Sequence, residues 1–334
     1  MRPYPQCEQM SATGQREVWV DCARTLAMFF IIWLHAAAAP VWTGKVVGGA
    51  IALFFLLAGY FLPVSARSVM QRTGRLALAW CAWSLLSVLF LLVFKPYVDI
   101  EWQRVVGWQV AAYNTPLWFL KTLVAYQLVA AVLLALRLLP RYVWVLVVFL
   151  ALCSYTTSPS QHLSVRFDYL WIFLLGVAAK PAGLAAVRQY MWRHGWILML
   201  AVLGVFLQPE VLEEYADFAD VSWRHCNLPL WNLAFMALFL LVSVLLTGCL
   251  PRVACWLASC GRWMLFIYAG HSYLLAPLYQ WKELRWAWNV WVPLLVLPLL
   301  VLLARLLSRL LPRTMALLQG QRRQIPDCRT QHAE

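Results

Sequence analysis

Ten long apolar runs, separated by short polar segments, dominate the hydrophobic pattern of the chain. A helix that crosses the hydrocarbon core of a bilayer needs about 20 apolar residues, with about 17 tolerated. Because lipid offers no partners to backbone polar groups, such spans are expected to be helical. The pattern predicts an all-α, polytopic integral membrane protein with about ten transmembrane helices. The fifth, sixth and seventh runs are short, which leaves the number of spans between residues 142 and 207 open. The predicted spans are Val18–Pro40, Val46–Val64, Leu76–Phe94, Leu117–Leu139, Tyr142–Tyr155, Val165–Ala179, His194–Leu207, Leu228–Leu246, Leu257–Tyr279 and Val290–Leu311.

The composition of the 334 residues excludes a water-soluble fold. Hydrophobic residues make up 63% of the chain and charged residues 12%, whereas about 25% of a typical globular chain is charged. Twenty Trp, sixteen Phe and long Leu and Val runs without heptads exclude disordered and coiled-coil classes as well. A lipid bilayer is therefore the expected environment.

The net charge of +13 follows the predicted loops and does not mark one basic domain. If the N-terminus is cytoplasmic, eighteen of the 27 Lys and Arg residues lie on the cytoplasmic side and seven on the other, while Arg24 and Lys121 lie inside spans. Cytoplasmic loops characteristically collect Lys and Arg. We expect both termini to be cytoplasmic, and no nucleic acid partner is needed to explain the charge.

The predicted domain organisation has one transmembrane domain, residues 18–311, between cytoplasmic tails at residues 1–17 and 312–334. A cleaved signal peptide is an alternative for the first run, because Ala23–Leu34 is followed by three alanines. The acidic residues Glu8 and Glu17 before the run, and the Arg and His inside it, are unlike a signal peptide. We expect the first span to be retained.

The first predicted span carries three ionisable side chains, Asp21, Arg24 and His35. Such groups cost roughly 2.5 to 3.5 kcal/mol each at a helix centre on insertion scales, so they are functional candidates. Eleven residues correspond to three helical turns plus about 20°, which places Arg24 and His35 on one face, ~16 Å apart along the axis. Asp21 lies on the same stripe. The alternatives are an interfacial ion pair for Asp21 and Arg24 and an interhelical hydrogen bond for His35.

The spacing of Arg24 and His35 resembles the signature of the acyltransferase-3 family of integral membrane acyltransferases. Four further segments resemble family motifs in the expected order, so the resemblance extends over about residues 18–311. Ala58 is a departure, because the family often has Ser there. The four segments are Phe54-Phe55-Leu-Leu-Ala-Gly59-Tyr60, Arg72-Thr-Gly-Arg75, Leu117-Trp118-Phe119-Leu120 and Tyr268-Ala-Gly-His271.

The resemblance implies transfer of an acyl group, often acetyl from acetyl-CoA, to a hydroxyl of a carbohydrate or lipid-linked glycan at the bacterial inner membrane. No bound cofactor is implied, since acyl-CoA is a substrate. His35 lies toward the outer half of the bilayer, where a neutral imidazole is suited to take the proton of an attacking hydroxyl. An acyl-imidazole intermediate is the alternative mechanism.

A polyanionic donor requires positive charge at the cytoplasmic entrance. Arg72 and Arg75 lie at i and i+3 near the start of the third span, so each guanidinium can form paired hydrogen bonds to phosphate oxygens. An ordinary positive-inside anchor is the alternative. Arg24, deeper on the His35 stripe, is expected to guide the pantetheine arm or a phosphate.

The remaining candidates are for the acceptor. Trp118 is a candidate to stack on a sugar ring, or else an interface anchor, and Lys121 either binds substrate or snorkels. His271, with Tyr268, is a candidate to orient the acceptor, and a helix–helix hydrogen bond is its alternative.

No metal site is predicted, because the nine cysteines include no Cys-x-x-Cys pair and no His pair has ligand spacing. A transporter or flippase is the competing functional class, since it too combines about ten helices with intramembrane charge. Carriers are expected to show paired halves with corresponding broken helices, and no such pairing is evident. The sequence leaves the acceptor, the acyl chain length and homo-oligomer formation open.

Overall fold

The computed structural model describes residues 17–36, 43–94, 117–139, 141–156, 167–206, 221–280 and 290–320. These residues form helices without a strand, which confirms the all-α prediction for the described chain. The α-helices in chain order are α2 (Val18–Leu34), α3 (Thr43–Tyr60), α4 (Ala66–Phe94), α6 (Leu117–Ala135), α7 (Val143–Thr156), α8 (Leu170–Ala179), α9 (Gly183–Phe206), α11 (Val221–Cys249), α12 (Pro251–Gly261), α13 (Met264–Gln280), α14 (Trp291–Leu310) and α15 (Pro312–Leu318).

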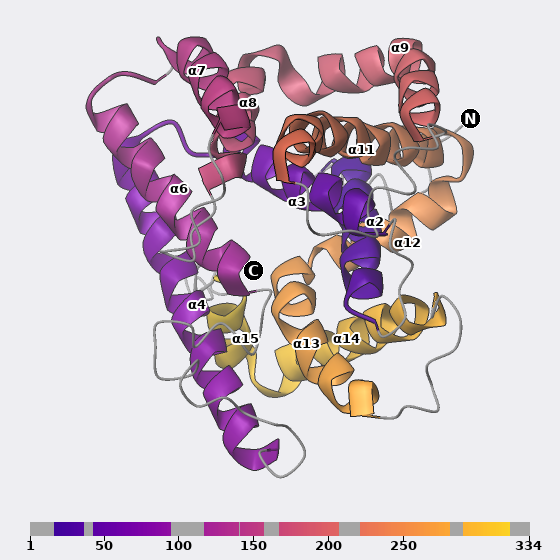
Figure 1. Ribbon diagram of the computed structural model, residues 1–334. Coiled ribbons are helices and arrows are strands. Elements are labelled where there is room, and N and C mark those ends of the chain that lie inside the picture. Colours follow the sequence, from indigo (N-terminus) through magenta and orange to yellow (C-terminus); the bar gives the residue numbers. More distant parts are fainter. Residues whose placement is uncertain are drawn as a thin grey trace, which may run out of the picture.

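Helix α2 lies at the centre of the assembly (Figure 1). It packs against α3, α11, α12, α13 and α14. Most of its side chains are buried, and Ala23, Ala27, Met28 and Ile32 have no exposed surface. The helix that carries the predicted catalytic residues is therefore surrounded by protein.

Helices α3 and α8 approach each other through two glycines. A Cβ atom on Gly59 would collide with the backbone oxygen of Phe173, and one on Gly176 would collide with the backbone oxygen of Leu56. Small residues allow such close backbone contact between membrane helices. The two helices consequently meet backbone to backbone at this crossing.

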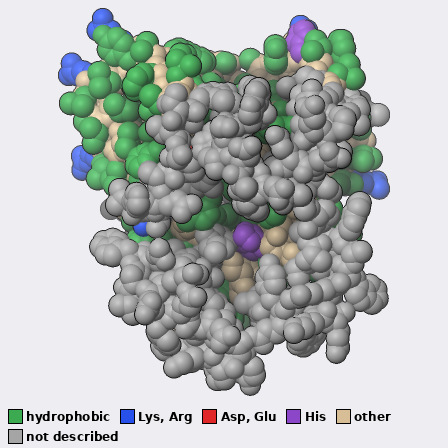
Figure 2. Space-filling view, viewed as in Figure 1, with side chains coloured by type: hydrophobic (Ala, Val, Ile, Leu, Met, Phe, Trp, Pro, Cys, Tyr) green, Lys and Arg blue, Asp and Glu red, His purple; other side chains and the backbone are tan. Residues whose placement is uncertain are grey.

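The described residues contain five helices long and apolar enough to cross a membrane, or six if one bent pair counts as a span. The prediction of about ten spans is therefore not confirmed. The two shorter apolar helices are Val46–Tyr60 and Val143–Cys153, and α2 has 17 residues. Apolar side chains cover much of the described surface in Figure 2, as expected of a multi-pass membrane protein. The candidate spans are Ala66–Phe90, Leu117–Ala135, Phe167–Ile197, Trp231–Cys249 and Trp291–Leu310.

Several predicted spans have the wrong boundaries. Helix α2 ends at Leu34, whereas the first span was expected to continue to Pro40, and residues 37–40 lie outside the described residues. The run Leu257–Tyr279 is not one helix, because α12 ends at Gly261, α13 starts at Met264, and the two are bent by 78°. The polar segment at 180–193 is not a loop between spans: a short 3-10 helix (η5, Lys180–Ala182) leads directly into α9.

Helix α15, after the last span, packs against α4, where Trp83 donates a hydrogen bond to the Leu318 oxygen at 3.0 Å.

Candidate functional site

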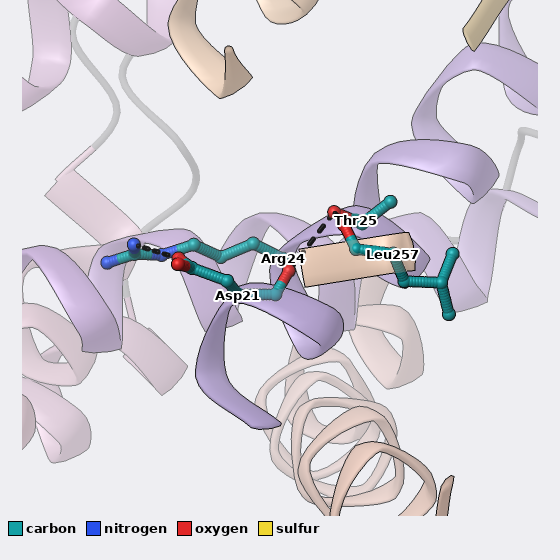
Figure 3. Close-up of polar contacts among 4 residues, drawn as sticks. All are labelled: Asp21, Arg24, Thr25 and Leu257. Carbon is teal, nitrogen blue, oxygen red and sulfur yellow. Dashed lines mark hydrogen bonds and ion pairs between the residues drawn. The ribbon is translucent and has the colours of Figure 1, made fainter. Parts of the chain in front are cut away.

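The N-terminal half of α2 carries an ion pair. Arg24 Nη1 lies 2.9 Å from Asp21 Oδ1, and the Arg24 and Asp21 side chains are 25% and 3% exposed (Figure 3). Thr25 donates to the Leu257 oxygen at 2.8 Å, which joins α2 to α12, while Gly261 packs directly against Asp21. The carboxylate is thereby held between two helices, and Arg24 extends from it toward a less buried region.

Three basic side chains contact the residues just after α3. Arg24 places its guanidinium carbon 5.2 Å from the centre of the Phe61 ring. Arg72 Nη1 donates to the Phe61 backbone oxygen at 2.6 Å, and Lys180 Nζ donates to the Leu62 oxygen at 2.7 Å. The last carbonyls of a helix lack internal partners and carry partial negative charge, so basic side chains are stabilised there. The end of α3 therefore draws cations from α2, α4 and η5 together.

Arg75 completes this cation cluster, which we define as Arg24, Arg72, Arg75 and Lys180. Arg24 and Arg75 are both close enough to Arg72 for their positive charges to repel it. Arg72 and Lys180 bind neutral carbonyl oxygens, and Arg75 Nε is buried without a hydrogen-bond partner in the described structure. Asp21 offsets only one of these charges, so the cluster retains a net positive charge suited to an anion.

The other end of α2 carries a histidine pair. His35 is the C-cap residue of α2, and its ring centre lies 5.3 Å from that of His271 on α13, with the planes inclined by 36°. His271 has no exposed surface. The two histidines are 236 positions apart in the chain, with most of the described helices between them, so this approach is a tertiary contact.

The surroundings of His271 define its tautomer. Its Nδ1 lies 2.6 Å from the Tyr268 backbone oxygen. Because a carbonyl oxygen only accepts, Nδ1 of a neutral ring carries the hydrogen and Nε2 is left with a lone pair. Nε2 is buried and has no hydrogen-bond partner among the described residues. A buried acceptor without a partner is costly, and a donor from substrate or from a rearranged neighbour would remove that cost.

A cluster of aromatic rings from three helices adjoins His271 through Tyr268. Tyr268 lies 6.1 Å from His271, 5.2 Å from Phe119 and 6.5 Å from Phe54, measured between ring centres. Trp118 joins the group through Phe119, at 6.2 Å. Helices α3, α6 and α13 thus form an aromatic wall beside the histidines.

The structure brings most of the predicted residues into two groups, one at each end of α2. Asp21, Arg24, Arg72 and Arg75 gather at one end of α2, and Tyr268 and His271 gather near His35 at the other. Trp118 reaches the second group only indirectly, while Lys121 lies one turn further along α6 and is partly buried.

Sequence reasoning missed Lys180 and Phe61. Lys180 was counted only as a charge of a cytoplasmic loop, and Phe61 as one more apolar residue of a span. The available signal was their position at the ends of apolar runs, where backbone carbonyls need partners. No group of three or more His, Cys, Asp or Glu side chains in the described ranges could hold a metal ion.

A family model described as an acyltransferase domain, acyltransferase-3, matches residues 17–310. The match covers every helix from α2 to α14, and so both ends of the site. No curated protein and no solved structure gave a match.

Proposed function

Since the chain belongs to the acyltransferase-3 family and is a multi-pass membrane acyltransferase, we propose that it transfers an acyl group, specifically acetyl, from acyl-CoA to a hydroxyl of a cell-surface carbohydrate or lipid-linked glycan. We place it in the bacterial inner membrane, as the family implies, with both termini cytoplasmic, as the loop charges predict. Family membership favours this activity over a transporter or flippase.

One observation carries the proposal: a cation cluster and a histidine pair lie at opposite ends of the same buried helix. An acyl-CoA is similarly divided, with phosphates at one end and a thioester at the other. Arg24 and His35 are separated by ~16 Å along the helix axis. The cluster at the cytoplasmic end therefore suits the phosphates, and the histidine end suits the thioester.

The proposed reaction is direct transfer with His35 as general base. The His35 imidazole takes the proton of the acceptor hydroxyl while the oxygen attacks the thioester carbonyl, which forms the new C–O bond. The C–S bond then breaks, and the leaving thiolate receives the proton from the imidazolium. The products are an ester and free CoA thiol, and the His35 imidazole returns to its neutral form.

His271 is proposed to position His35. With its Nδ1 hydrogen bound to the Tyr268 oxygen, its Nε2 is an acceptor, and the centre of its ring lies 5.3 Å from that of His35. A His35 N–H directed at that acceptor would leave the other His35 nitrogen unprotonated for the acceptor hydroxyl. His271 would thus select the tautomer of the base without touching substrate.

The roles of the other residues follow from their places. Asp21 orients Arg24 through the ion pair, and Arg24, Arg72, Arg75 and Lys180 hold the phosphates of the donor. Tyr268 and Trp118 belong to the aromatic wall, which offers apolar faces to the acceptor sugar. Lys121 remains a candidate acceptor contact.

The test uses purified full-length protein in lipid nanodiscs with acetyl-CoA. We expect release of free CoA thiol that depends on an added glycan acceptor, and no release from the His35→Gln variant. The natural acceptor is found by comparing surface glycans of a deletion strain and its complemented parent by mass spectrometry. Absence of both acetyl-CoA consumption and any acetyl difference would refute the proposal.

A further inference from the structure

A second group of arginines lines a pocket between α14 and the end of α12 with the two residues that follow it. The pocket has a volume of about 280 Å³. We call it the arginine pocket, and none of its basic residues belongs to the cation cluster. Its polar and aromatic lining consists of Ser259, Arg262, Trp263, Arg305, Ser308 and Arg309.

The three guanidiniums of this pocket have no counter-charge in the described structure. Arg305 and Arg309 lie four residues apart on α14, and Arg262 follows the end of α12. None of the three side chains forms an ion pair or hydrogen bond with a described residue. Like charges on one helix face at this spacing repel one another. An anion in the pocket would relieve that repulsion.

The arginines are the hydrogen-bond donors available to such an anion. Ser259 donates to the Trp256 oxygen and Ser308 to the Arg305 backbone oxygen, both at 2.7 Å, so both hydroxyl hydrogens are already used. Guanidinium groups bind phosphate through two parallel hydrogen bonds. The donor set therefore fits a phosphate group.

The outer face of α14 indicates where that phosphate comes from. Leu295, Leu299, Leu302 and Leu306 are each more than half exposed, and their spacing of four, three and four residues aligns them on one face that continues to Arg309. In a membrane span, such a stripe contacts acyl chains. Trp263 at the pocket is a residue type enriched at the headgroup level.

We propose that the arginine pocket binds the phosphate of an anionic phospholipid headgroup, with the acyl chains along the α14 leucine stripe. The shared chemistry is a phosphate ester, which a free phosphate compound would also supply. The apolar stripe favours the lipid, because a soluble phosphate has no acyl chains to contact the exposed leucines. This site is independent of the acyl-transfer reaction, so its test does not depend on the proposed function.

The experiment titrates detergent-solubilised full-length protein with phosphatidylglycerol, phosphatidylcholine or inorganic phosphate and measures bound ligand by native mass spectrometry. The variant is Arg305→Gln with Arg309→Gln, and Arg313→Gln on α15 is the matched control, since Arg313 is exposed and does not line the pocket. We expect Kd for phosphatidylglycerol to rise at least about tenfold in the double variant, as for the loss of a charge-assisted hydrogen bond. The control is expected to bind like the wild type.

Three results would overturn the proposal: equal binding by the double variant, equal loss in the control, or binding of inorganic phosphate as tight as that of phosphatidylglycerol. If the Gln variant does not fold, Arg305→Lys with Arg309→Lys decides. Lysine keeps the charge but not the paired geometry, so we expect phosphatidylglycerol binding weakened by a smaller factor. Unchanged binding by a folded Lys variant would count against the site.

Discussion

The two ends of α2 lie in different environments, one rich in positive charge and the other built from two histidines and aromatic rings. At one end, three cations from α2, α4 and η5 contact the turn after α3, two of them held by backbone oxygens, and Arg75 lies near Arg72. At the other, His35 meets one fully buried histidine inside a wall of aromatic rings. Charge attraction falls off gradually with distance, whereas proton transfer requires hydrogen-bond contact. The comparison teaches that substitutions at the cation cluster should alter donor affinity, and substitutions at the histidine pair should alter turnover.

The largest expected effect separates these roles at the histidine end. His35→Ala should lower kcat by about 10²–10⁴-fold, the usual contribution of a general base, with little change in KM for acyl-CoA. The measurement is thiol release by purified protein in nanodiscs. His35→Gln keeps a hydrogen-bonding group but cannot take a proton at neutral pH, so it should be equally inactive. A folded Gln variant with near wild-type turnover would show that His35 only packs.

The next effect concerns the cation cluster. Arg72→Ala with Arg75→Ala should raise KM for acetyl-CoA by about 10- to 100-fold, as expected for lost charge-assisted hydrogen bonds. Acetyl-pantetheine, which lacks the nucleotide, should be affected much less, and this donor is the internal control. Lys replacements should restore only part of the affinity. An equal loss with both donors would mean that the arginines support the fold and do not bind phosphates.

A smaller effect is expected at His271, which we propose to act through His35. His271→Leu should lower kcat by about tenfold, since the proposed hydrogen bond to His35 cannot form, and should leave KM for acetyl-CoA unchanged. His271→Gln can present an oxygen near the position of Nε2 and should recover part of the turnover, whereas the shorter Asn should not. Equal activity of the Leu and Gln variants, or a change in KM alone, would contradict the positioning role.

The smallest effect should come from Lys180, a partly exposed member of the cation cluster. Lys180→Ala should raise KM for acetyl-CoA by about two- to fivefold, in line with a partly exposed charge. The matched control is Arg188→Ala on α9, an exposed basic residue outside the cluster. A larger loss for Arg188→Ala than for Lys180→Ala would show that general positive charge, and not this cluster, determines donor binding.

The sequence predicts most of α2. Its apolar run indicates a helix from Val18, and the eleven-residue spacing predicts that Arg24 and His35 share one face. The helix itself ends at Leu34, so that His35 follows it as the C-cap residue. Met28 and Ile31, between them on the same stripe, are buried, as expected of a face turned toward other helices. Periodicity succeeds here because the relation lies within one helix.

Relations between helices were not accessible in the same way. The contact of His35 with His271 depends on how α13 packs against α2, and the spacing of residues within one helix says nothing about it. The 78° bend after Gly261 was missed because hydropathy measures composition and not direction. Lys180 was missed because a lysine that binds a helix end and one that only faces the cytoplasm look alike in sequence.

The glycine crossing of α3 and α8 has a mechanical consequence for the cation cluster. Gly59 lies two residues before Phe61, and Gly176 lies four residues before Lys180. With no side chain between the two backbones, neither helix can slide without moving the other. The crossing therefore fixes the positions of Leu62 and Lys180 relative to each other. A single methyl group added at either glycine would separate the two helices and so displace residues of the cation cluster, although neither glycine belongs to it.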